Sequence, residues 1–83
     1  MNESFKARGQ MIRQRMLECI IKNLEEKGYA PSIRELGEMV GLKSFSSVHA
    51  HLLKMHNEGM IVYETDKQRA IGVPGYKFVK VVD

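Results

Sequence analysis

The chain has 83 residues and carries 13 Lys and Arg against 10 Asp and Glu, a net charge of +3 at pH 7. This length provides a single small domain over residues 1–83, with a core for a few helices or strands. The lone cysteine, Cys19, excludes an internal disulfide framework and favours a reducing, cytoplasmic location, and no apolar run is long enough to predict a membrane partner.

Apolar residues recur at helical spacing in the first third of the chain. Ile12, Met16 and Ile20 lie four residues apart, which places them on one stripe of a helix. We predict an amphipathic helix over about residues 10–27, ended by Gly28.

The stretch "SIRELGEMVG" predicts a short second helix over about residues 33–40. Ser32 and Glu35 have the spacing of a capping box, in which each side chain bonds the other residue's backbone amide. Gly37 would let another helix approach closely. Gly41 supplies the left-handed conformation that a sharp turn requires.

A third helix is predicted over about residues 45–58, with Ser44 as its N-terminal cap. Its core face comprises Val48, Leu52 and Met55, spaced by four and three. The residues expected opposite that core are Ser46, Ala50, Leu53, Lys54 and Asn57, with Ser47 and His49 on the two shoulders. Two helices joined by a short glycine turn, the second exposing small, polar and basic groups, are typical of a helix-turn-helix.

Two short β-branched segments follow the third helix and predict a hairpin with strands over about 60–64 and 69–73. Lys67 and Arg69 would lie at its tip and flank. The predicted fold is therefore mainly α with a small β-hairpin (α+β), a three-helix winged helix-turn-helix. The C-terminal extension 74–83 has strand-forming composition, and would either extend the sheet over the core or pair with a second copy.

The three histidines do not predict a metal site or a catalytic site. His49 and His51 are two residues apart, and His56 follows five residues later, whereas helical zinc sites use spacings of three or four. The neighbouring serines lack a strained nucleophile turn and an oxyanion hole. We therefore expect no metal, no cofactor and no enzyme activity.

Binding to double-stranded DNA accounts for more of the pattern. Between Glu38 and Glu58 the chain has no acid, so little would repel a polyanion from the third helix. Hydroxyl, imidazole and lysine groups can donate to phosphates or to base edges in the major groove. The alternative is a protein-interaction module that uses the same exposed helix, and the outward-facing Leu53 favours it.

The stretch "GYAPSIRELGEMVGLKSFSSVHAHLLKMHNEGMI", continued by "RAIGV", resembles the DNA-binding domain of the LexA repressors. The similarity includes the capping-box turn, the G-L-x-S entry to the third helix and the V-H-x-H-L body. It covers roughly residues 28–73 and implies transcriptional repression in a bacterium, phage or mobile element.

The resemblance also implies residue roles. It implies base reading by Ser44, Ser46, Ser47, His49 and Ala50. It implies phosphate contacts by Arg34, Lys43 and Lys54, with Lys67 and Arg69 on the wing. His51 would have a packing or backbone role.

Several features depart from the family. Phe45 stands where the family has a small residue or proline, and would either pack as an N-terminal staple or contact a thymine methyl. Ala50 replaces a frequent glycine. The peptidase domain of the LexA proteins, which dimerises them, is missing, so the chain would be an excised fragment or, as we expect, a stand-alone regulator. Inverted-repeat operators are read by dimers, which makes a homodimer on DNA a possible assembly.

Overall fold

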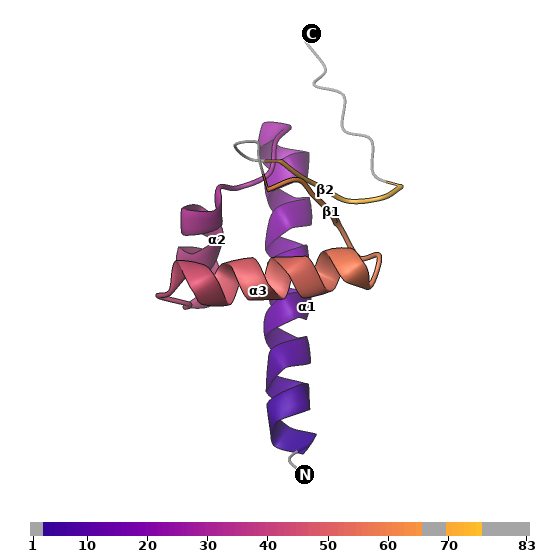
Figure 1. Ribbon diagram of the computed structural model, residues 1–83. Coiled ribbons are helices and arrows are strands. Elements are labelled where there is room, and N and C mark those ends of the chain that lie inside the picture. Colours follow the sequence, from indigo (N-terminus) through magenta and orange to yellow (C-terminus); the bar gives the residue numbers. More distant parts are fainter. Residues whose placement is uncertain (1–2, 66–69, 76–83) are drawn as a thin grey trace, which may run out of the picture.

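A computed structural model describes residues 3–65 and 70–75. Three helices come first along the chain: α1 (Glu3–Lys27), α2 (Ile33–Val40) and α3 (Phe45–Asn57). A two-stranded antiparallel sheet of β1 (Val62–Tyr63) and β2 (Ile71–Gly72) follows them. In Figure 1, α3 crosses α1 at a steep angle, and α2 and the hairpin lie on the same side of that crossing. The predicted three-helix winged helix-turn-helix is confirmed.

Helix α1 begins at Glu3, so the predicted start near residue 10 was wrong. The prediction followed the apolar stripe, which begins at Ile12, but "ESFKARGQ" contains Glu, Lys, Ala and Arg, which are good helix formers without need of such a stripe. The N-terminal part of α1 consequently projects beyond the point where α3 crosses it (Figure 1). Although α1 is long, none of the helices within the described part of the chain is long and apolar enough to cross a membrane.

The core lies between the three helices and the hairpin. Asn23 is a polar residue that is also buried. Its Nδ2 donates to the Tyr29 carbonyl at 2.8 Å, which holds the loop after α1. The buried apolar side chains are Met16, Ile20, Ala30, Leu36, Val40, Val48, Leu52, Met55, Ile61, Tyr63 and Ile71. Every helix and both strands contribute to this set, so the orientation of α3 depends on all of them.

The capping box at the start of α2 is present. The Ser32 hydroxyl accepts from the Glu35 amide at 3.1 Å, and the Glu35 carboxylate accepts from the Ser32 amide at 2.8 Å. Gly41 ends α2 in the left-handed conformation, with φ of 77°, and donates to the Gly37 carbonyl. These local bonds fix both ends of α2, and with them the turn that leads into α3.

Replacing Gly37 with alanine should destabilise the domain by about 1–3 kcal/mol. A Cβ atom at this position would lie 2.9 Å from the Leu42 carbonyl oxygen and 3.1 Å from a methyl of Val48. Because backbone and a buried side chain are the obstacles, the gain in helix propensity cannot offset the clash. Urea denaturation of the variant measures the loss.

Gly9→Ala is the matched control, since Gly9 is also helical but its added Cβ would meet only the end of the long Arg13 side chain, which can shift slightly, and no backbone atom. We expect this variant to be as stable as the parent or more stable by up to about 1 kcal/mol. Equal stability of the two variants would show that α2 and α3 do not require the close approach.

The hairpin is shorter than the predicted strands over 60–64 and 69–73. Val62 pairs with Gly72 and Tyr63 with Ile71, and the Glu64 amide extends the pairing to the Ala70 carbonyl at 2.9 Å. The first strand starts late because the Met60 amide donates to the Met55 carbonyl at 2.9 Å and so closes the end of α3.

Candidate nucleic-acid interface

The outward side of α3 carries mostly polar and small residues, with Leu53 among them. Val48, Leu52 and Met55 are buried, as expected from their spacing. The exposed residues of α3 on the other side include Ser46, Ser47, Ala50, Leu53, Lys54 and Asn57. The helix therefore has one anchored side and one side able to enter a groove.

The turn between α2 and α3 presents two further predicted site residues, Lys43 and Ser44, both exposed. Ser44 is in the N-cap position with extended backbone, but its side chain forms no capping hydrogen bond. The expectation that its hydroxyl caps α3 was wrong. Its hydroxyl is thus available to a ligand at the positive end of the helix dipole.

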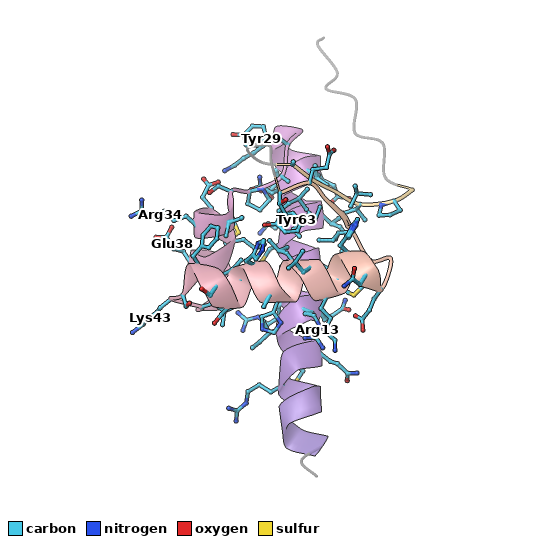
Figure 2. All side chains as sticks on the ribbon, viewed as in Figure 1. Arg13, Tyr29, Arg34, Glu38, Lys43 and Tyr63 are labelled. Carbon is cyan, nitrogen blue, oxygen red and sulfur yellow. The ribbon has the colours of Figure 1, made fainter. Side chains whose placement is uncertain are left out.

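Cationic side chains come from three consecutive elements. Arg34 on α2, Lys43 in the turn and Lys54 on α3 are all exposed. Figure 2 shows Arg34 and Lys43 extending outward on the side of the molecule where α3 begins. Glu38, an exposed acid of α2, lies on the same side (Figure 2). The two predicted wing cations, Lys67 and Arg69, lie outside the described residues, as does the extension beyond residue 75.

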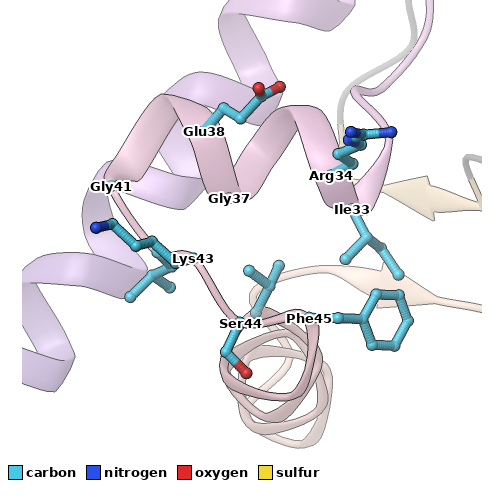
Figure 3. A pocket seen from close by; sticks show the side chains of 10 residues that line it. Ile33, Arg34, Gly37, Glu38, Gly41, Lys43, Ser44 and Phe45 are labelled. Atoms are coloured by element: carbon cyan, nitrogen blue, oxygen red, sulfur yellow. The ribbon is translucent and has the colours of Figure 1, made fainter.

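A groove of about 660 Å³ separates α2 from the start of α3. Figure 3 shows the helices facing each other across it, with Arg34 and Glu38 on one side and Phe45 on the other. Its walls also include apolar and small residues: Ile33, Gly37, Gly41, Leu42 and Val48. The groove thus has an apolar floor and a charged rim next to the N-terminus of α3.

His49 is held by the hairpin at the shoulder of α3. Its Nδ1 lies 2.8 Å from the Tyr63 hydroxyl, and the two rings meet edge to face with centroids 5.6 Å apart. Burial raises the pKa of the Tyr63 phenol, so the hydroxyl keeps its proton near neutral pH. Because Nδ1 is engaged with Tyr63, the ring orientation is fixed and Nε2 is the nitrogen that a ligand would meet.

His51 connects α3 to α1. Its Nδ1 is 3.1 Å from Arg13 Nη1, so the guanidinium donates and the imidazole accepts. Burial lowers the pKa of His51, and the positive charges of Arg13 and Lys54 lower it further. A neutral imidazole is the form that this hydrogen bond requires. The predicted packing role of His51 agrees with this geometry.

Arg13 is a cation beside α3 whose position sequence reasoning missed. It lies on α1, yet Figure 2 places it where α1 and α3 cross, and together with Lys54 it affects the charge of His51. No spacing in the sequence indicates this proximity, since it depends on the angle between two helices far apart in the chain.

The third histidine also faces the hairpin. His56 Nδ1 accepts from the Tyr63 amide at 3.2 Å, so two histidines of α3 bind one residue of β1. Across residues 3–65 and 70–75, no three His, Cys, Asp or Glu side chains lie close enough to share a metal ion. The histidines of this helix hold its neighbours in place.

Comparison with known proteins assigns this arrangement to a family. Residues 11–70 match the LexA DNA binding domain family. The chain is 48% identical over 59 residues to the LexA repressor of Brevibacillus brevis, an alignment that covers 71% of this chain and 28% of that protein. It is 46% identical over 61 residues to the LexA repressor of Listeria monocytogenes, covering 74% of this chain and 30% of that protein.

The chain therefore spans under a third of the length of the relatives that it matches. The matched segment begins within α1 and contains the whole of α2, α3 and β1. Because the match covers well over half of the sequence and the fold agrees with it, the chain belongs to the LexA DNA-binding domain family.

Proposed function

We propose that this domain binds double-stranded DNA in a sequence-specific manner and acts as a transcriptional repressor in a bacterium or phage. The observation that carries the proposal is the side of α3 opposite the core, which is exposed and bordered by cations from α2 and the turn. Family membership supports DNA as the ligand.

In the proposed complex, α3 enters the major groove. Base edges would meet the exposed Ser44, Ser46, Ser47 and Ala50, together with Nε2 of the half-buried His49. Short hydroxyl side chains and a methyl group suit this position because they allow the helix backbone to approach the bases closely. The specificity of the complex would come from this set.

Phosphates on either side of the groove would meet the cations. Arg34, Lys43 and Lys54 are exposed on three successive elements, and Arg13 adds a fourth from α1. Such contacts position a protein on the duplex and make its affinity depend on salt. Lys67 and Arg69 are proposed to contact the adjacent backbone from the wing, and two copies would bind an inverted repeat.

A protein partner is the second candidate. Leu53 is 38% exposed in the middle of the outward face of α3, where an apolar residue would suit a protein surface better than a phosphate backbone. The cations that border the same face favour DNA over this alternative.

The direct test is selection of duplexes from random sequence, followed by fluorescence anisotropy on the selected duplex and a scrambled one at several salt concentrations. We expect the selected duplex to bind at least 10³-fold more tightly, as is typical of specific complexes. Ser47→Ala and His49→Ala should alter the selected sequence, whereas Lys22→Gln on the exposed face of α1 should leave it unchanged.

Equal binding of both duplexes would contradict base reading. Absence of binding to any duplex would contradict DNA as the ligand and would favour the protein partner.

A further inference from the structure

The first residue of α3, Phe45, has no evident role in the fold. Its side chain is 65% exposed, although a phenyl ring at this point could have packed into the groove beside it. The position lies between the proposed base-reading residues Ser44 and Ser46 in the sequence, at the end of α3 where the proposed interface begins.

Neighbouring rings hold Phe45 in one orientation. Its ring stacks on His49 with centroids 5.9 Å apart and an interplanar angle of 13°. His49 in turn is hydrogen-bonded to the Tyr63 hydroxyl, which belongs to a buried residue of β1. An exposed ring supported in this way loses little conformational freedom when a ligand covers it.

The surroundings of the ring indicate the chemistry of its ligand. Phe45 borders the groove together with the apolar Ile33 and the cationic Arg34 and Lys43 (Figure 3). A ligand that fits must present a small apolar group close to acceptors and phosphates. In the major groove only thymine does so, because its C5 methyl stands beside the O4 acceptor.

We propose that Phe45 is a specificity-determining residue that contacts the C5 methyl of a thymine in the operator. This inference rests on the proposed DNA-binding function. The stacked His49 would then hydrogen-bond through Nε2 to a base edge next to that thymine. The pair of rings would recognise adjacent positions, one by apolar contact and the other by hydrogen bonding.

The test replaces each thymine of the selected duplex, one at a time, with deoxyuridine, which lacks only the methyl group. For the wild-type chain we expect one position in each half-site where the replacement weakens binding about four-fold, the effect of one buried methyl. Phe45→Ser should abolish this sensitivity at that position alone, and Phe45→Leu, which keeps an apolar side chain, should retain part of it.

Met11→Ser is the matched control, because Met11 is 66% exposed on α1. This variant should bind the thymine and the deoxyuridine duplexes with the affinities of the wild-type chain. Circular dichroism confirms that the variants are folded. If no thymine of the duplex is sensitive, or if Phe45→Ser weakens thymine and deoxyuridine duplexes equally, the inference is wrong while DNA binding stands. If the wild-type chain shows no sequence preference, the proposed function fails, and the inference fails with it.

Discussion

Replacing Tyr63 with alanine is expected to lower the free energy of unfolding by about 3–5 kcal/mol, as for other buried aromatic residues. Tyr63 is 8% exposed within the core cluster, and its hydroxyl and amide bind two histidines of α3. The substitution would create a cavity and remove the hydroxyl's bond to His49, whereas the backbone amide's bond to His56 would remain. A loss of this size is a large fraction of the stability of a small domain, and urea denaturation measures it.

Two further variants separate the contributions to this loss. Tyr63→Phe keeps the ring and removes only the hydroxyl bond to His49, which should cost about 1 kcal/mol. Val62→Ala alters the neighbouring strand residue, which is 44% exposed, and should cost less than about 1 kcal/mol. If Tyr63→Ala were no more destabilising than Val62→Ala, the hairpin would not be fastened to α3 in the way that we describe.

The second large effect concerns DNA affinity. Affinity for DNA falls as salt rises, so the plot of log affinity against log salt has a negative slope. Simultaneous replacement of Arg34, Lys43 and Lys54 with glutamine should make this slope shallower by about 2.7, since each phosphate contact contributes about 0.9. Between 200 mM and 50 mM salt the deficit of the variant relative to the wild type would then grow about 40-fold. Anisotropy titrations of the selected duplex at both salt concentrations measure this change.

The control removes the same charge from elsewhere. Arg15, Lys22 and Lys27 are exposed on α1, and their replacement with glutamine leaves the proposed interface intact. We expect this variant to keep nearly the wild-type slope. If both triple variants changed the slope equally, the net charge of the domain rather than its arrangement would govern binding.

The parts of the fold that sequence predicted well are those with local causes. The capping box of Ser32 and Glu35 defines the start of α2 within four residues of sequence, and Gly41 defines its end. The spacing of Val48, Leu52 and Met55 similarly identified the buried side of α3. Since these signals depend on neighbours along the chain, they can be interpreted without knowledge of the tertiary structure.

The errors and omissions have tertiary causes. The late start of β1 results from the Met60 amide closing α3, and Ser44 occupies the N-cap position of α3 without a capping hydrogen bond from its side chain. The bonds of His49, His51 and His56 reach Tyr63 and Arg13 on other elements. A helical wheel places these histidines on shoulders but does not identify their partners, because the partners depend on how the elements cross.

The two hydrogen bonds between Tyr63 and α3 have a consequence for how the domain would recognise the shape of an operator. His49 and His56 are seven residues apart on α3, and both bind the same residue of β1. Tyr63 of β1 is therefore attached to α3 at two points about two helical turns apart, an arrangement that resists pivoting of the strand. In the proposed complex, the distance between the major-groove contacts and the backbone contacts of the wing would be set by the protein. A duplex with another groove width would have to deform to reach both, so base pairs that no side chain touches would contribute to the choice of site.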